Sequence, residues 1–174
     1  MKTYLNRHPG ATRDNYDEEV ARIILQDKPD LVVLAGWMHI LSQRFLDLLH
    51  GVSPAPASQG REELLAHKPI PVINLHPALP GAFDGVNAIQ RAWEAFQQKE
   101  IEKAGVMVHR VIKEVDRGEP LVVRELEMIE GETLEEYETR IHQAEWEVIV
   151  SGTKKALESL DEWVKVERAS IEGR

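Results

Sequence analysis

The sequence has no cysteine among its 174 residues. This excludes disulfides, thiolate metal sites and a cysteine nucleophile, and it fits a reducing compartment. No apolar run approaches the roughly 20 residues that cross a bilayer, and Met1–Tyr4 does not begin a signal-peptide pattern. We therefore expect a cytoplasmic protein with no membrane partner.

Positive charge is also scarce. The chain has 21 Lys and Arg against 30 Asp and Glu, which gives a formal net charge of −9. Such a balance argues against nonspecific binding to nucleic acid or to anionic membranes. The apolar content of 43% is ordinary for a globular protein, and the length suffices for one domain with a real core.

Several common signatures of chemistry are missing. The sequence contains no His-x-x-x-His or His-Glu-x-x-His pattern, no Gly-x-Ser-x-Gly elbow, no phosphate-loop signature and no Gly-x-Gly-x-x-Gly. The seven histidines are scattered along the chain, and no thiol accompanies them. We therefore expect no transition-metal site.

Apolar runs alternate with helical patterns along much of the chain. We expect helices over 12–26, 42–49, 86–102 and 133–160, and strands over 2–5, 31–35, 71–76, 105–112 and 121–126, with an extended piece at 163–166. Thr12 or Asp14 is the expected cap of the first helix and Ser42 that of the second, and Thr133 with Glu136 predicts a capping box at the start of the last. The apolar run 31–35 is typical of a strand covered on both faces. This order predicts an α/β fold with a doubly wound, mostly parallel sheet flanked by helices and some antiparallel pairing.

One domain over 1–160 is expected, with a turn-rich surface insertion at about 51–70 and a tail over 161–174. The last four residues, Ile171–Arg174, resemble a protease-cleavage linker of expression vectors. They are therefore left out of the fold prediction.

Asn74 and His76 follow a short apolar run and precede a loop stiffened by Pro77 and Pro80. Residues two apart in an extended chain project from the same face. An amide donor and an imidazole at the end of a strand suit the stabilisation of a developing oxyanion. The alternative is structural, because an Asn-x-His sequence is common and its polar groups are most often satisfied by loop backbone.

Asp116 lies in a loop between two predicted strands, where an aspartate next to glycine is usually only a turn residue. The functional alternative is a carboxylate that folds back over His76, favours the imidazolium and raises the His76 pKa. A protonated His76 beside Asn74 would then give one oxyanion two donors. A raised pKa would stabilise the fold at low pH, and this benefit would fade as the pH rises through the folded value.

Two other residues have open assignments. Trp37, in a short apolar loop at a strand end, fits a core position and one wall of a slot for a flat ring equally well. His109 alternates with apolar neighbours in a predicted strand, which favours a core residue or one that supports a site.

Taken together, these stretches resemble the folate-dependent formyltransferase family, and they most resemble its fungal form. The similarity covers about residues 12–157, and its matching segments run in the family's order: 29–42, 73–79 with Gly85, 105–109, 114–121 and 136–145. Asn-x-His-Pro followed at a distance by the aspartate is specific in combination. The resemblance implies the fold predicted above.

The resemblance also implies a reaction. A formyl group would pass from the co-substrate 10-formyltetrahydrofolate to the amine of glycinamide ribonucleotide in purine biosynthesis, by direct attack and without a covalent enzyme intermediate. Asn74 and His76 would stabilise the tetrahedral oxyanion, while Asp116 would set the state of His76 and order a water that carries protons. The implied partners are small molecules, with no metal and no nucleic acid, and the oligomeric state is not indicated.

Binding residues follow from the same resemblance. The pterin would be wrapped, largely by backbone, by Met38, His39, Ile40, Leu41, Asn74, Ile112, Lys113, Glu114, Val115 and Asp116, with Arg13 near the folate. The ribonucleotide would contact His142, Gln143, Ala144 and Glu145. Glu145 would accept hydrogen bonds from ribose hydroxyls. The sequence departs from the bacterial form at His39, where Arg is common, and at His142, where Gln is common.

The family domain begins with a strand and a Gly/Ser/Asn loop that holds the nucleotide phosphate, and no stretch of this sequence resembles that loop. We therefore expect weakened or absent activity for the chain as given. The alternatives are a formyltetrahydrofolate hydrolase, a tRNA-formylating relative and a non-catalytic module that binds folate. The segment at Glu145 disfavours the first two, and the acidic chain lacks the basic C-terminal domain expected of a tRNA enzyme.

Overall fold

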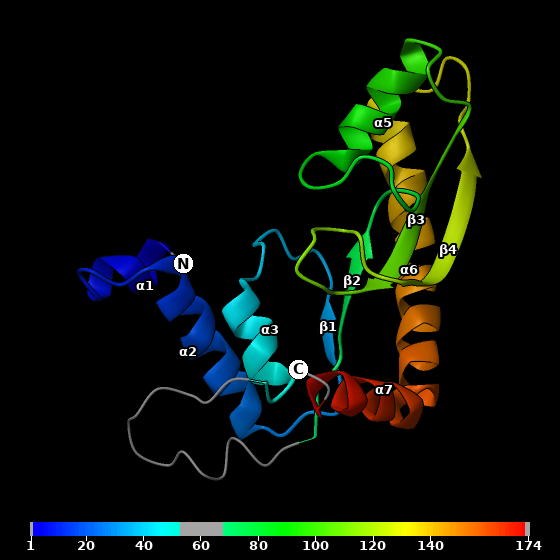
Figure 1. Cartoon of the computed structure of the whole chain (residues 1–174). Helices are drawn as coiled ribbons and strands as arrows, with labels where there is room; N and C mark the ends of the chain where they lie inside the picture. The colour runs from blue at the N-terminus through cyan, green and yellow to red at the C-terminus, as the bar shows by residue number, and fades with distance from the viewer. Residues whose placement is uncertain (1, 53–67, 173–174) are drawn as a thin grey trace. The chain divides into compact units, whose positions relative to one another are not determined.

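The computed structural model describes residues 2–52 and 68–172, which form two compact units (Figure 1). Unit 1 consists of the chain up to Val32, residues 39–71 and the chain from Ser159. Unit 2 consists of residues 33–38 and 72–158. Most of the insertion predicted at 51–70 and the last two residues of the predicted linker lie outside the described residues. Within the described ranges, no helix combines the length and the apolar character of a membrane span.

Unit 1 contains the helices α1 (Lys2–Arg7), α2 (Arg13–Gln26), α3 (Gln43–Leu49) and α7 (Leu160–Glu172). The predicted caps of α2 and α3 are confirmed. The Thr12 hydroxyl accepts from the backbone N–H of Asn15, and the Ser42 hydroxyl accepts from that of Phe45. These bonds satisfy amide groups that a helix start leaves without partners. α3 then buries an apolar face made of Phe45, Leu46, Leu48 and Leu49.

Two strand predictions in unit 1 are wrong. Residues 2–5 lie in α1 and residues 163–166 lie in α7. Both stretches are short, and a short apolar run does not distinguish a strand from a helix by its periodicity. The ring of Tyr4 in α1 stacks on that of His8, which directly follows the helix, with ring centroids 4.3 Å apart. Residues four apart are neighbours on a helical surface.

The sheet has the strand order β1 (Val32–Leu34), β2 (Val72–His76), β3 (Lys103–Arg110) and β4 (Pro120–Glu127). The predicted α/β fold with helices around a sheet is confirmed. The sheet is mixed, with more antiparallel pairing than predicted, because β3 runs antiparallel to both β2 and β4. The prediction that residues 31–35 are covered on both faces is wrong, since Val33 is 38% exposed.

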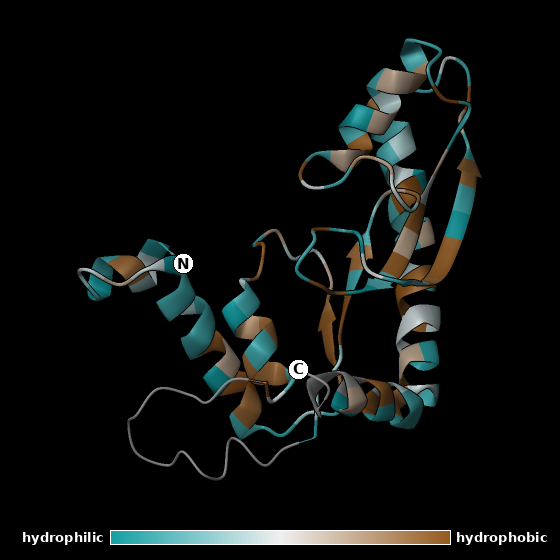
Figure 2. Cartoon of the chain, in the orientation of Figure 1, coloured by the Kyte–Doolittle hydropathy of each residue, from teal (hydrophilic) through white to brown (hydrophobic). Residues whose placement is uncertain are grey.

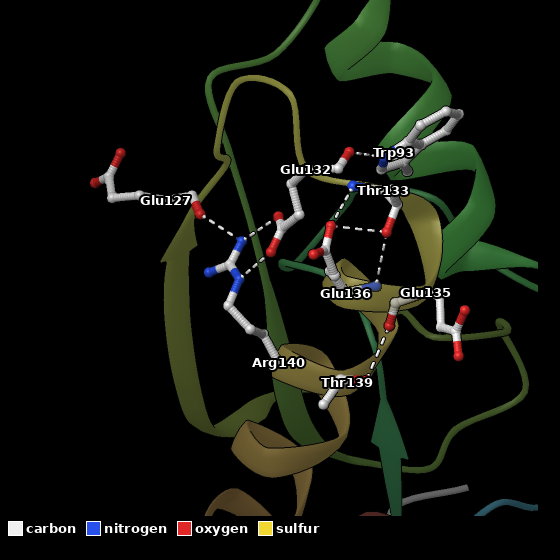
Figure 3. A network of polar contacts seen from close by, with 8 residues as sticks. All are labelled: Trp93, Glu127, Glu132, Thr133, Glu135, Glu136, Thr139 and Arg140. Carbon is white, nitrogen blue, oxygen red and sulfur yellow. Dashed lines mark hydrogen bonds and ion pairs between the residues drawn. The ribbon is translucent and has the colours of Figure 1, made fainter.

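Two helices accompany the sheet in unit 2, α5 (Ala88–Gln97) and α6 (Leu134–Glu158). α5 is shorter than the predicted helix over 86–102. α6 begins with the predicted capping box, in which Thr133 and Glu136 exchange hydrogen bonds (Figure 3). Figure 3 also shows the bidentate ion pair of Arg140 with Glu132, whose backbone carbonyl accepts from the indole N–H of Trp93 on α5. These bonds fix the start of α6 against α5.

α6 runs along the sheet beside β3 and β4 (Figure 1). β2 and β3 are largely apolar (Figure 2), and Ile73, Val106 and Val108 are fully buried. The helix lies close to the strand at Gly152, where a Cβ atom added to the glycine would lie 2.6 Å from two carbons of the Val108 side chain. Glycine is therefore required there by the packing of α6 on β3.

We expect Gly152→Ala to destabilise the protein by about 1–3 kcal/mol, because overpacking a filled core costs that much. In an open helix position the same change would stabilise, since alanine is the better helix former. The measurement is the free energy of unfolding in urea. Ser151→Ala, at the exposed neighbouring position, is the matched control, and equal stability of the two variants would contradict the packing argument.

Candidate functional site

Four groups surround the carboxylate of Asp116 in unit 2. The backbone N–H of Gly85 donates to Oδ2 at 2.8 Å, and the side-chain amide of Asn74 donates to Oδ1 at 3.3 Å. Two imidazoles complete the cluster: Nδ1 of His76 lies 3.5 Å from Oδ2, and Nε2 of His109 lies 3.4 Å from Oδ1. The convergence of Asn74, His76 and Asp116 expected from the sequence is present.

The pairing of β2 with β3 explains why His109 belongs to this cluster. Asn74 lies opposite His109 in the antiparallel register, and their side chains are 3.3 Å apart between Nδ2 and Nε2. His109 is 2% exposed. It is thus both a core residue and a contact of the site, and the register of the two strands brings it there.

The loop that carries Asp116 has an unusual backbone. Asp116 adopts a left-handed conformation, with φ of 56°, which is uncommon for residues other than glycine and costs free energy. Gly118 packs so closely that a Cβ atom would lie 1.7 Å from the carbonyl oxygen of Arg110. Arg117 pairs with Asp84 at 2.5 Å and so ties this loop to the one that supplies Gly85. Strain held by such contacts is typical of functional positions.

Asp116 is ionised at neutral pH. Burial by itself raises the pKa of this carboxyl, but the hydrogen bonds from His109 and from the Gly85 N–H, with the charges of the two imidazoles, outweigh it and lower the pKa below its ordinary value. The folded pKa is therefore below the unfolded one. The resulting stability is present above the unfolded pKa and is lost as the pH falls through the folded value.

The prediction that His76 has a raised pKa is wrong. Burial lowers the pKa of His76 below its ordinary value, although Asp116 raises it, because the loss of hydration outweighs the attraction of the carboxylate. His109 lowers it further, while the Ala82 carbonyl and Asp84 raise it. The stability argument reverses as well: between the folded pKa and the unfolded one, the unfolded chain binds more protons, so stability falls as the pH is lowered through that window.

His109 has two further contacts besides Asp116. Its Nδ1 lies 2.8 Å from the backbone carbonyl of Arg110 and donates to it, and its Nε2 lies 3.3 Å from the amide nitrogen of Asn74. The Asn74 amide is thus placed between Asp116, to which it donates, and His109. Within the described residues, Nε2 of His76 makes no hydrogen bond of regular geometry. The cluster offers an oriented amide donor and a neutral imidazole backed by a carboxylate.

The residues predicted to contact the pterin fall in both units. In unit 2, Met38 is 71% and Ile112 43% exposed, and the neighbouring Lys113 and Glu114 are exposed too. Trp37, at 40% exposed, is not a core residue. These side chains are therefore accessible to a ligand.

In unit 1, the guanidinium of Arg13 donates to the backbone carbonyl of Ile40, and its Nη2 lies 3.4 Å from Nδ1 of His39. Ile40 is 48% exposed and Leu41 is half-buried. Arg13 therefore contacts the predicted pterin loop itself.

The residues predicted to bind the ribonucleotide lie on α6, directly after Arg140 and its ion pair (Figure 3). His142 and Gln143 are exposed, and Nδ1 of His142 lies 2.6 Å from the carboxylate of Glu145. Ala144 is buried, at 3% exposed. The ligand-accessible side chains of this segment are therefore His142, Gln143 and Glu145. No grouping of three or more potential metal ligands occurs in residues 2–52 and 68–172.

Comparison with known proteins adds three findings. The family model described as formyl transferase matches residues 61–153. Phosphoribosylglycinamide formyltransferase of Saccharomyces cerevisiae is 45% identical to this chain over 151 residues, which are 85% of this chain and 62% of the relative. The Dictyostelium discoideum protein of that name is 40% identical, over 88% of this chain and 69% of its own length. The crystal structure of the Campylobacter jejuni protein of that name superposes with a TM-score of 0.63 at 31% identity, covering 84% of this chain and 65% of the other. The chain thus spans less than two thirds of the length of the yeast relative.

We expect NMR titration to place the His76 pKa below 6.5, the ordinary value for histidine. Asp116→Asn removes the largest contribution that raises this pKa and should lower it further. Asp84→Asn, which removes a weaker contribution of the same sign, should lower it less. An unchanged His76 titration in Asp116→Asn would show that the carboxylate and the ring are not coupled.

Proposed function

The chain belongs to the formyl transferase family, and we propose that it transfers the formyl group of 10-formyltetrahydrofolate to the amine of glycinamide ribonucleotide. The observation that carries the proposal is the convergence of Asn74, His76 and the ionised Asp116 within 3.5 Å contacts. The names of the relatives at 40% and 45% identity support the choice of acceptor. Both substrates are small molecules.

Asn74 is the donor for the formyl oxygen. As the amine attacks, that oxygen gains negative charge, and a preorganised amide N–H stabilises it without a costly reorientation of solvent. In the unliganded protein Asn74 is oriented by Asp116 and His109. One of its two N–H groups turns to the oxyanion while the other keeps the amide in place.

His76 carries the proton. Its lowered pKa keeps the ring neutral before reaction, so it can accept the proton that the attacking amine must lose. The imidazolium that forms lies beside Asp116, whose charge stabilises it. The new C–N bond forms at the formyl carbon, the bond to N10 of the folate breaks, and His76 returns the proton to N10. This role replaces the protonated donor expected from the sequence.

The proposed binding residues divide between the ligands. The folate is held by the backbone of residues 112–116 with Met38 and Asn74, and by Arg13 and residues 39–41. The ribonucleotide is held by α6, where Glu145 accepts from the ribose hydroxyls and His142 orients its carboxylate from 2.6 Å. Holding two substrates in register is a large part of such a reaction.

The direct test incubates the chain with 10-formyltetrahydrofolate, with and without glycinamide ribonucleotide, and follows both tetrahydrofolate and formylglycinamide ribonucleotide. We expect release of tetrahydrofolate that depends on the ribonucleotide, with one formylated product per folate released. The rate should be low, because the sequence contains no stretch that resembles the family's phosphate-binding loop. Folate release at the same rate without the ribonucleotide would instead identify a hydrolase.

Asn74→Ala should lower the rate of formyl transfer by about 10²–10³-fold, because it removes the oxyanion donor. The binding of both substrates should change much less than the rate. Gln90→Ala, at an exposed position of α5, is the control for an amide outside the cluster. A loss below tenfold for Asn74→Ala, in a variant that melts at the temperature of the unmutated chain, would contradict the assigned role.

A further inference from the structure

Asp17 is a fully buried carboxylate of α2 that the proposed reaction does not use. From the sequence it is one of several acidic residues near the start of a helix, where negative charge is favourable. The structure gives it specific partners. Its Oδ2 accepts from the backbone N–H of Ser42 at 2.7 Å, and its Oδ1 lies 2.5 Å from Nε2 of His39.

Arg13 precedes Asp17 by four residues and lies on the same side of α2, so the two side chains occupy successive turns. Arg13 can only donate hydrogen bonds. Its contact with Nδ1 of His39, at 3.4 Å, therefore makes that nitrogen an acceptor and places the ring proton on Nε2, which donates to Asp17. The directions of this chain of bonds, from Arg13 through His39 to Asp17, are thus determined.

The bonds anchor one loop at several points. Asp17 holds the His39 side chain and the Ser42 backbone, and Arg13 holds the carbonyl of Ile40. Ser42 in turn caps α3. The rings of Tyr16 and His39 pack nearly perpendicular to each other, with centroids 5.5 Å apart. The backbone of residues 39–42 is consequently fixed from α2 on one side and by α3 on the other.

We propose that Asp17 is a positioning residue for folate: it holds residues 39–42 in the conformation in which their backbone groups meet the ligand. The inference rests on the proposed function, since it assumes that this loop binds folate. A buried ionised group needs several donors, and here the donors are the loop itself. The loop conformation and the burial of the charge therefore depend on each other.

The experiment measures the dissociation constants of the full chain for an unreactive 10-formylfolate analogue and, separately, for glycinamide ribonucleotide. Asp17→Asn still accepts from Ser42 but turns an amide N–H toward the N–H of His39. The loss of this hydrogen bond releases the loop from the conformation that meets the ligand, so we expect the folate analogue to bind roughly 10–100-fold more weakly. Binding of the ribonucleotide should not change.

Matched variants separate positioning from a general structural effect. Asp14→Asn, at an exposed position of the same helix, is the control for the lost charge and should leave both dissociation constants unchanged. If Asp17→Asn does not fold, His39→Leu tests the same link, because it removes the donor that faces Oδ1 of Asp17. It should weaken folate binding and leave ribonucleotide binding unchanged, and an unchanged folate affinity in this variant would overturn the inference.

Two results for Asp17→Asn would also overturn the inference. One is unchanged folate affinity in Asp17→Asn when the nitrogen shifts of His39 show that its bond to residue 17 is broken. The other is an equal loss of affinity for both ligands, which indicates a general structural role. In either case the unmutated chain still binds folate; if it does not bind the analogue at all, the proposed function itself fails, and the inference with it.

Discussion

The site depends on one buried negative charge. Asp116 is 9% exposed at its side chain, and it stays ionised because hydrogen bonds and imidazoles surround it. Removing the donors from a buried charge costs several kcal/mol. The loop containing Gly85, the amide of Asn74 and the ring of His76 are therefore held where this carboxylate needs them. The same charge later stabilises the imidazolium that forms during the proposed reaction.

Both units use the same arrangement. Asp116 in unit 2 gathers the backbone N–H of Gly85 and the imidazoles next to it, and Asp17 in unit 1 gathers the backbone N–H of Ser42 and the imidazole of His39. In each case the backbone donor comes from a loop far away in the sequence. A loop bound to a buried charge keeps its shape without a ligand, which reduces the entropy that ligand binding must overcome.

The sequence was most informative where structure is local. The caps at Thr12, Ser42 and Thr133 follow from residue types at fixed spacings, and all three are present. Residues 2–5 and 163–166 were wrongly predicted because short apolar runs are ambiguous. The convergence on Asp116 was expected from a family resemblance, since no local spacing relates residues 74 and 116.

Other features of the site depend on burial and register, which the sequence does not specify. The sign of the His76 pKa shift is a balance between lost hydration and the attraction of Asp116, and it was predicted wrongly because the extent of burial was unknown. The contact of His109 with the carboxylate depends on its position opposite Asn74 across two strands. Asp17 could have been suspected only from its spacing to Arg13, which many exposed helix pairs share.

The most direct test of this account is the titration of the Asp116 carboxyl carbon, followed by carbon NMR in the unliganded protein. The account predicts a pKa below 3.8, the ordinary value for aspartate, because the donors outweigh the burial. A pKa above that value would mean that burial dominates and that the carboxylate is not held by its neighbours. The claim that hydrogen bonds and imidazoles stabilise this carboxylate in its buried position would then be wrong.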